Sequence, residues 1–482
     1  MRKRMICIML AGCMCAGMLA GCGQKDAGGT DKASEGSSQA QESQEKEEPA
    51  DSQAGTEAEE EPAEGAAQAA SFEGQEMSFV AFGGGGYSEY WEEIVKKFEE
   101  AYKVTVHLEM TPQVNDLLQT KFASGDVPDV AVLTYDGSAI ANAVVEDHAL
   151  MDLTALFEKP GIDDATPLKD QMLDGLLDST AYAPYNDGVP YFAPTSAAPN
   201  GLFYNRTLFE KNGWEVPVTW DDFFALGDAA KEKGIALFTF QGIYPSYMEI
   251  MIPSQIVSAL GVEGLADIYS YKEGSFRRPE VVEILTNVQK IATEGYLLEG
   301  TLSMNHTQSQ SEMMMDRALF IPCGSYIVAE MADAPRTEGF SFGICAPPVL
   351  EEGQLPYISA TANSLAIPAN AKNPELAMEF IRFLYSDESV RLLAEKSDDV
   401  MALKQGYELS SEYLSDDMKH IYEIYDSANF FSVSWDVMPS GCNIAITNYM
   451  YSVLADVLTE KMSVDDWVSG VEDAFTEINT YK

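Results

Sequence analysis

The sequence predicts an α/β protein whose body is built on a largely parallel sheet. Short apolar runs alternate with stretches that repeat apolar residues at helical spacing, which is the pattern of strands and helices in such sheets. The chain has 482 residues, of which 46% are hydrophobic. At about 150 residues per domain, a chain of this size is expected to form two or three domains.

An export signal precedes the body. The chain starts with Met-Arg-Lys-Arg, continues with an apolar run over residues 5–19 and reaches Leu-Ala-Gly-Cys at residues 19–22. A charged start, a short apolar stretch and small residues before a cleavage point are typical of a secretory signal peptide. Because Cys22 follows the small residues directly, the segment resembles a bacterial lipobox. Residues 1–22 are therefore interpreted as a lipoprotein signal peptide with lipidation at Cys22, and the alternative is an ordinary secretory signal with a chance cysteine.

Residues 23–74 are expected to form a disordered acidic linker. Up to residue 71 this segment has no aromatic and no large aliphatic side chain, and it carries 13 acidic residues and 3 lysines. Such a composition cannot bury enough apolar surface to offset the entropy lost on folding. The linker would let the body stand away from a membrane to which Cys22 is anchored.

The first part of the body follows the order strand, helix, strand, helix, strand. Residues 77–82 are apolar and residues 83–86 are four glycines, which predicts a buried strand and a tight loop. A helix is predicted next, because apolar side chains from Trp91 to Tyr102 recur at helical spacing. Residues 104–110 alternate like a strand, residues 117–123 suggest a second helix, and residues 130–133 form a third apolar strand.

Ligands of such sheets bind beyond the carboxyl ends of the strands. The glycine loop and the turn at Tyr135 and Asp136 are therefore expected to face a ligand. The loop has neither the lysine pattern of a P-loop nor the G-x-G-x-x-G pattern of dinucleotide-binding proteins. The alternative for these glycines is a flexible turn that contacts no ligand.

Charge and residue usage exclude several classes of function. The formal charge of −47 argues against nucleic acid and against electrostatic docking on anionic lipid, since both need Lys and Arg on the protein. Outside residues 1–22 the cysteines are Cys323, Cys345 and Cys442, and the four histidines are widely spaced, which favours neither a disulfide framework nor a metal centre. Three buried thiols are the preferred interpretation, with one disulfide and one free thiol as the alternative.

Five segments carry a resemblance to a known family. They read FASGDVPDVAVL at 122–133, GLFYNRTLFEKNGW followed by VPVTWDDF at 201–223, ALFIPCGSYIVAEM at 318–331, SFGICAPPVL at 341–350 and NSLAIPANAKNPELAMEFIRFLYSDE at 363–388. In the second segment, Thr219 and Asp222 also form a plausible capping box. Together and in this order, the segments resemble the extracellular solute-binding proteins of carbohydrate ABC importers, of which the maltodextrin receptors are one branch.

The resemblance implies the periplasmic-binding-protein fold: two α/β lobes joined by a hinge that the chain crosses several times, with the ligand cleft between them. Lobe one is expected to hold residues 75–195 and 356–406, and lobe two residues 199–348 and 412–482. Crossings are expected near 193–198, 347–357 and 404–411. Closure of the lobes around a ligand would make the shape that an importer recognises.

The resemblance also implies which residues line the cleft. A sugar receptor needs aromatic rings for the face of the sugar and polar side chains for its hydroxyls. Tyr326 stands where the family has a stacking Trp, and it is the leading candidate. The full set that matches cleft segments of the family is Tyr87, Tyr135, Asp136, Gln241, Tyr244, Tyr247, Tyr326, Asn363, Trp435 and Asp436. Each tyrosine has core packing as its alternative, and Trp91, Trp220 and the methionines at 313–315 are expected to be core residues.

The function implied is that of a substrate-binding lipoprotein of an ABC importer. It would capture a carbohydrate, an oligosaccharide or amino sugar, and deliver it to separate permease subunits, as a monomer with no cofactor and no metal. It would be lipid-anchored at the extracytoplasmic face of the cell membrane. The segment at 305–331 looks nearest to receptors for N-acetylglucosamine or short chito-oligosaccharides. The alternatives are a non-sugar solute such as a peptide or polyamine, and a cell-surface glycoside hydrolase, although G-x-S-x-G and H-E-x-x-H motifs are absent.

Overall fold

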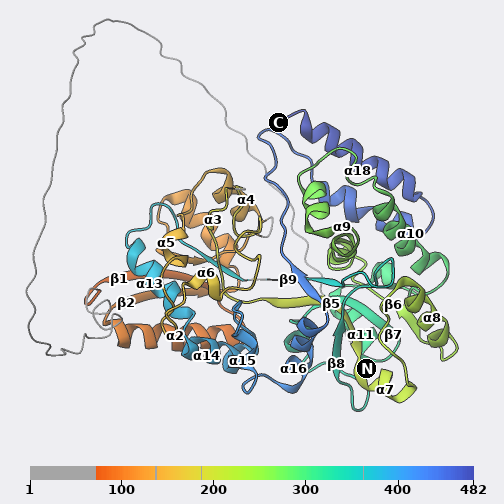
Figure 1. Ribbon diagram of the computed structural model, residues 1–482, viewed down its shortest axis with the longest axis horizontal. Helices are drawn as coiled ribbons and strands as arrows, with labels where there is room; N and C mark the ends of the chain where they lie inside the picture. Colours follow the sequence, from red (N-terminus) through yellow and green to blue (C-terminus); the bar gives the residue numbers. More distant parts are fainter. Residues whose placement is uncertain (1–71, 136–137, 186, 362) are drawn as a thin grey trace, which may run out of the picture. The chain divides into compact units, whose positions relative to one another are not determined.

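The computed structural model describes residues 72–482 except 136–137, 186 and 362. The predicted signal peptide, Cys22 and residues 23–71 of the linker therefore lie outside the described residues. Within the described part, two mixed sheets organise the fold (Figure 1). None of the helices in this part is long and apolar enough to span a membrane.

The first sheet has five strands in the order β2-β1-β3-β10-β4. The strands are β1 (Glu76–Phe82), β2 (Thr105–Thr111), β3 (Val130–Val132), β10 (Ser364–Ala366) and β4 (Ala193–Pro194). β1 is parallel to β2 and to β3, as the alternation of strands and helices predicts, and β10 is antiparallel to β3 and β4. The helices of this part of the chain are α2 (Gly86–Tyr102), α3 (Val114–Ser124), α4 (Ala139–Glu146), α5 (Thr154–Phe157), α6 (Leu168–Gln171), α13 (Pro374–Leu384), α14 (Asp387–Ser397) and α15 (Gly406–Ser410).

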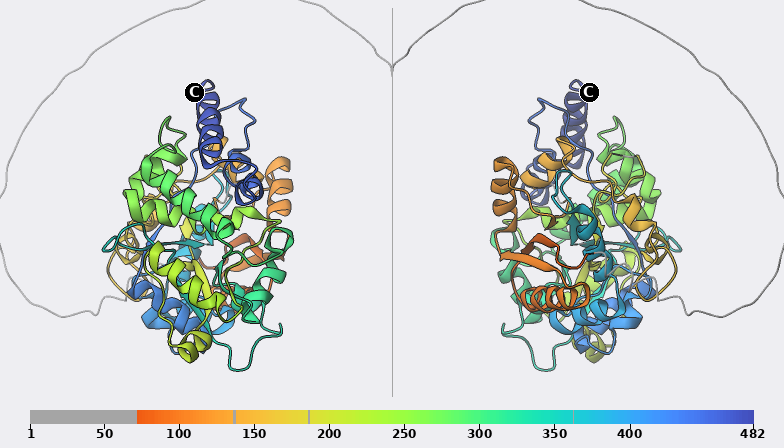
Figure 2. Two further views of the ribbon diagram at one scale, coloured as in Figure 1. Left: turned by 90° about the vertical axis from the view of Figure 1, so that its right-hand side faces the viewer. Right: turned by 90° about the vertical axis from the view of Figure 1, so that its left-hand side faces the viewer.

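Helix α2 forms where the sequence predicts a helix, and it packs on the first sheet beside α14 (Figure 2). Trp91 is buried and meets Phe79 of β1 edge to face, with ring centroids 5.1 Å apart. Phe98 meets Phe380 of α13 in the same way at 5.1 Å. The predicted role of Trp91 as a core residue is therefore confirmed.

The second sheet follows the path β11-β9-β5-β7-β6, and β8 also pairs with β5. Its strands are β5 (Ala198–Asn205), β6 (Ala236–Phe238), β7 (Ala318–Gly324), β8 (Phe342–Cys345), β9 (Tyr357–Thr361) and β11 (Asn429–Phe431). The α-helices around it are α7 (Arg206–Asn212), α8 (Trp220–Lys231), α9 (Ile252–Tyr269), α10 (Pro279–Thr293), α11 (His306–Met314), α12 (Ile327–Glu330), α16 (Asp416–Tyr422), α17 (Leu454–Leu458) and α18 (Val464–Asn479). Shorter helical turns are η1 (Pro245–Glu249), η2 (Thr301–Ser303), η3 (Glu423–Asp426) and η4 (Asn448–Ser452).

Local signals in the second sheet's helices agree with the sequence. The capping box of Thr219 and Asp222 starts α8, and Trp220 packs in the core. Met313 and Met314 are buried, as expected, whereas Met315 is exposed. Cys323 and Cys345 are buried free thiols and Cys442 is a partly buried one, so the preferred interpretation of three thiols holds, apart from the partial exposure of Cys442.

The chain passes between the sheets more than once. β4 belongs to the first sheet and β5 to the second, and later β9 belongs to the second sheet and β10 to the first. This second passage lies after β9, later than the expected crossing near 347–357, because β9 pairs with both β5 and β11. The lobe limits given above remain a prediction.

Candidate functional site

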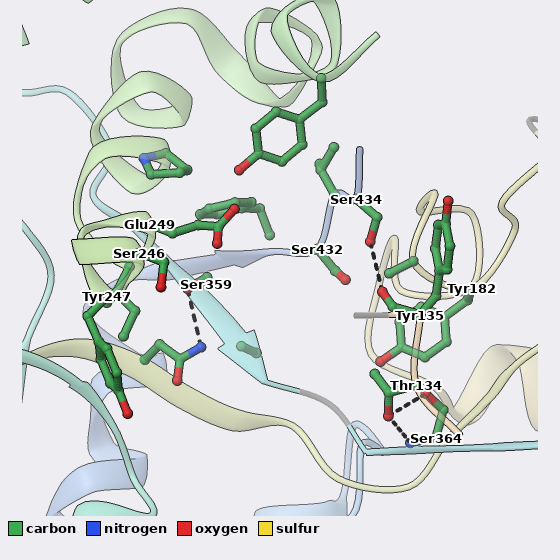
Figure 3. A pocket seen from close by; sticks show the side chains of 18 of the residues that line it. Thr134, Tyr135, Tyr182, Ser246, Tyr247, Glu249, Ser359, Ser364, Ser432 and Ser434 are labelled. Carbon is green, nitrogen blue, oxygen red and sulfur yellow. Dashed lines mark hydrogen bonds between the residues drawn. The ribbon is translucent and has the colours of Figure 1, made fainter. Parts of the chain in front are cut away.

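A cavity of about 390 Å³ is lined by residues from segments around both sheets (Figure 3). Its lining is rich in aromatic rings and hydroxyl groups and contains one carboxylate. The residues are Thr134, Tyr135, Ala181, Tyr182, Asn200, Ser246, Tyr247, Glu249, Ile250, Pro253, Tyr269, Tyr326, Ser359, Ala360, Ser364, Phe431, Ser432, Val433 and Ser434. Such a mixture of apolar area and a few polar groups is typical of a small-molecule site.

One side of the cavity follows the carboxyl end of β3. Tyr135 stacks on Phe192 at 6.1 Å between ring centroids, and its hydroxyl reaches the Trp435 backbone oxygen at 3.5 Å. Tyr182 lies close by, with its side chain almost fully buried (Figure 3). Burial raises the pKa of both phenols, that of Tyr135 to about 12, so both are neutral hydroxyls at physiological pH.

The opposite side is formed by η1 and the start of α9 and α12. Ser246, Tyr247 and Glu249 come from η1, where Pro245 stands at the first position of the turn. Tyr326 comes directly before α12 and is 40% exposed, and its phenol is a hydrogen-bond partner of Tyr247. The two tyrosines thus present a pair of rings to the cavity.

Glu249 is the carboxylate of this cavity. Burial raises the pKa of its carboxyl group above the usual range, while the nearby Trp435 and Tyr269 side chains act in the opposite direction. The Tyr269 phenol in turn has a pKa raised by burial and by the nearby carboxylate, so it stays a hydrogen-bond donor. The site therefore holds an acidic group whose neighbours are neutral rings and hydroxyls.

Short polar side chains complete the lining. The Asn200 side-chain amide donates to Ser359 Oγ at 3.3 Å, and Ser434 Oγ donates to the Tyr135 backbone oxygen at 3.4 Å (Figure 3). Thr134 and Ser364 contact each other where β3 ends beside β10. These groups can exchange hydrogen bonds with a ligand that carries many hydroxyls.

A second cavity of about 610 Å³ adjoins the first. The two share Tyr135, Glu249, Tyr269, Val433 and Ser434. The second cavity adds the stack in which the Trp435 ring lies 4.1 Å from Tyr269 and 5.6 Å from Tyr271, at interplanar angles of 21° and 19°. Its other lining residues are Asn142, Asp436, Met438, Cys442, Asn443, Ile444, Ala445, Ile446 and Thr447. Together the cavities offer room for more than one sugar ring.

The structure brings five of the ten candidates from the sequence to these cavities. Tyr135, Tyr247 and Tyr326 line the first cavity, and Tyr135, Trp435 and Asp436 line the second. Asp136 lies outside the described residues. Ligand contact by these residues remains a prediction.

The other four candidates line neither cavity. The Tyr87 hydroxyl donates to Asp399 and accepts from the Asn363 side chain at 3.0 Å. Gln241 is fully buried and donates to the Pro322 backbone oxygen at 3.0 Å. Tyr244 is 47% exposed and lies near His306, with 6.0 Å between ring centroids.

Glu249, Tyr182 and Tyr269 also line the first cavity, and they are not among the ten residues predicted from the sequence. Glu249 stands two residues after Tyr247, so the sequence indicates the correct segment. It does not indicate the turn that brings both side chains to the cavity. Tyr269 ends a long helix, where a ring at helical spacing has the pattern of a core residue. Tyr182 lies in an irregular segment without a periodic pattern.

Comparisons with known proteins show the family and the fold of this chain. The profile of bacterial extracellular solute-binding proteins matches residues 93–419. The chain is 24% identical over 325 residues to the diacetylchitobiose binding protein NgcE of Streptomyces coelicolor, with 64% of this chain and 64% of that protein covered. It is 22% identical over 322 residues to the multiple sugar-binding protein of Streptococcus mutans, with 65% and 72% covered. The chain thus spans a little under two thirds of the first of these relatives.

Solved structures share the fold. The apo-form of RafE from Streptococcus pneumoniae superposes with a TM-score of 0.66 at 19% identity, covering 84% of this chain and 98% of that one. A chitin oligosaccharide binding protein superposes with a TM-score of 0.64 at 18% identity, covering 84% and 99%. At these identities the likeness shows the fold, which is that of periplasmic solute-binding proteins.

Proposed function

Because this chain belongs to the bacterial extracellular solute-binding protein family, we propose that it is the receptor subunit of an ABC importer, which captures a carbohydrate and delivers it to a membrane permease. The family is one of extracytoplasmic binding proteins rather than enzymes. The observation that carries the carbohydrate assignment is the lining of the first cavity, where several tyrosine rings stand among serine, threonine and asparagine side chains. Rings cover the apolar face of a sugar, and the short polar groups match its hydroxyls.

The relatives support a carbohydrate over a peptide or polyamine. One is named for diacetylchitobiose and another for multiple sugars, and a solved structure of the RafE protein holds raffinose. Diacetylchitobiose and raffinose are therefore the first saccharides to test with this chain. The two adjoining cavities favour an oligosaccharide over a monosaccharide.

Ligand-induced stabilisation tests this proposal. A panel of mono- and oligosaccharides is added to the purified body, and the melting temperature is measured for each. A true ligand at 100 times its Kd adds about 2.7 kcal/mol to the free energy of unfolding. A panel in which no saccharide shifts the melting temperature would contradict the carbohydrate assignment.

Tyr326→Ala tests whether the cavity is the binding site. Loss of this ring should raise the Kd of the best saccharide by at least about tenfold, or ~1.4 kcal/mol. Tyr413→Ala is the matched control, because Tyr413 is an exposed tyrosine outside both cavities and outside the predicted ligand-contact set. Equal Kd values for the two variants, measured by titration calorimetry, would place the ligand elsewhere.

Incubation with labelled oligosaccharides distinguishes a receptor from a glycoside hydrolase. A receptor returns the sugar unchanged after binding it, whereas turnover would favour the enzyme.

The lipid anchor is a further part of the proposal, supported by the lipobox-like residues 19–22. Cys22→Ala should release the protein into the medium, and continued retention on the membrane would contradict anchoring through Cys22.

A further inference from the structure

The two cavities meet at a carboxylate beside an aromatic stack, and we propose that the solute bound there carries an ammonium group, as an amino sugar with a free amine does. This inference rests on the proposed function and narrows its carbohydrate to a cationic one. It uses Glu249, which lines both cavities, and the rings of Trp435, Tyr269 and Tyr271.

The charge of the residues that line the two cavities favours a cationic solute over an anionic one. Among the described residues that line the two cavities, Glu249 and Asp436 carry carboxylates, and there is no Lys, Arg or His. Recognition of sugar acids and sugar phosphates relies on Arg, Lys or backbone N–H groups at a helix N-terminus. An anionic solute would meet only like charge here, so the site selects against it.

The surroundings of Glu249 favour binding of a cationic group over binding of two neutral hydroxyl groups. Its neighbours Tyr269 and Trp435 bring no positive charge, and burial opposes ionisation of the carboxyl group. Glu249 is half-buried, and a carboxylate that is partly removed from water, with no opposite charge among the described lining residues, carries a desolvation cost that a bound ammonium group offsets. Neutral hydroxyls can satisfy the oxygen lone pairs but leave that charge uncompensated.

The aromatic stack supplies apolar lining beside the two carboxylates. Trp435 lies nearly parallel to Tyr269 and to Tyr271, so three rings form one continuous stack next to the carboxylates of Glu249 and Asp436. A sugar ring that bears an ammonium group combines an apolar face for the rings with a charge for the acids.

A matched pair of ligands tests the inference. The glucosamine disaccharide with two free amines and its diacetylated form share one backbone and differ in charge. Their Kd values are measured by titration calorimetry at about pH 6, where the amines are protonated. The free-amine form should bind at least about tenfold more tightly, which corresponds to ~1.4 kcal/mol. Equal binding, or tighter binding of the acetylated form, would overturn the inference.

The variant Glu249→Gln tests whether Glu249 causes the preference for the free-amine disaccharide. Gln keeps the size and can still hydrogen-bond, so the variant should bind the acetylated disaccharide as before and lose most of the preference for the free amine. Glu263→Gln is the control, because Glu263 is an exposed carboxylate on α9 outside both cavities. If Glu249→Gln still binds the free-amine disaccharide more tightly than the acetylated one, the Glu249 carboxylate is not the cause of that preference.

The outcomes separate this inference from the proposed function. If neither disaccharide binds but raffinose or another neutral saccharide does, the ammonium inference is wrong and the carbohydrate receptor stands. If no saccharide binds, both are wrong. Binding of a polyamine without any saccharide would also reject both, since it would replace the carbohydrate by a non-sugar cation.

Discussion

Glu249 makes the stability of the empty protein depend on pH. Burial raises the pKa of its carboxyl group in the native state, so the native protein binds a proton more readily than the unfolded chain. The free energy of unfolding therefore falls as pH rises from the usual Glu value of about 4.3 through the raised pKa. Below that range the carboxyl is protonated in both the native and the unfolded state, so Glu249 no longer makes the free energy of unfolding depend on pH.

Glu249→Gln should remove this dependence. At pH 7 the variant should be more stable than the parent protein in urea denaturation without ligand, because no charge is buried. The difference should vanish at about pH 3.5, below the usual pKa of Glu. Glu263→Gln should leave the free energy of unfolding unchanged at both pH values, and a less stable Glu249→Gln at pH 7 would contradict the argument.

The candidate site could be predicted from sequence in part. Tyr135, Tyr247 and Tyr326 could be predicted because they stand in segments that resemble cleft segments of the family, and they line the first cavity. Tyr87 matches such a segment as well, yet its hydroxyl binds Asp399, which is 312 positions away in the chain. A pattern of neighbouring residues contains no information on such a distant partner, so sequence alone could not separate Tyr87 from the cavity residues.

The start of α2 is a close packing point between two helices. A Cβ atom on Gly86 would lie 1.7 Å from the Lys396 backbone oxygen in α14. The glycine run at 83–86 thus has a packing role in addition to its turn, and none of these glycines lines either cavity.

Gly86→Ala should destabilise the protein, because one of the two helices must move. The expected loss is about 1–3 kcal/mol in the free energy of unfolding, as for overpacked cores. Gly470→Ala in α18 is the matched control: no atom lies within 4 Å of the added Cβ, and helix propensity should give a gain of about 0.5–1 kcal/mol. Chemical denaturation of both variants checks the contrast, and a neutral Gly86→Ala would contradict the close approach.

Elements with strong periodicity could be predicted from sequence, and those defined by distant pairing could not. β1, α2, β2, α3 and β3 lie where spacing and alternation place them. β10, by contrast, is a three-residue strand that joins the first sheet between β3 and β4 in antiparallel orientation. So short a segment has no usable period, and its position depends on where the chain returns from β9.

Asp399 connects parts of the molecule that are far apart in sequence. It accepts hydrogen bonds from Tyr87 at the start of α2 and from Tyr422 of α16, the latter at 2.7 Å. Asn363, located between β9 and β10, donates to Tyr87 and to Ser196, which lies between β4 and β5. This network thus links the passage between β4 and β5 to the passage between β9 and β10.

Tyr422→Phe should weaken this network. Tyr422 is buried, and loss of its hydroxyl leaves Asp399 with one donor fewer, so the free energy of unfolding should fall by about 1–3 kcal/mol. Tyr413→Phe is the control, because Tyr413 is exposed and lies near α16 in sequence. Equal stability of the two variants in guanidinium denaturation would mean that the hydroxyl contributes little to holding the passages together.

The strand order has a consequence for how the chain reaches its native state. β10 lies inside the first sheet and β9 lies inside the second, yet both follow residue 356 in the chain. During synthesis neither sheet can close until these late strands have emerged, and pairings across such sequence separations form slowly. A nascent chain with two unfinished sheets stays open for longer, so the described body completes its fold only late in synthesis.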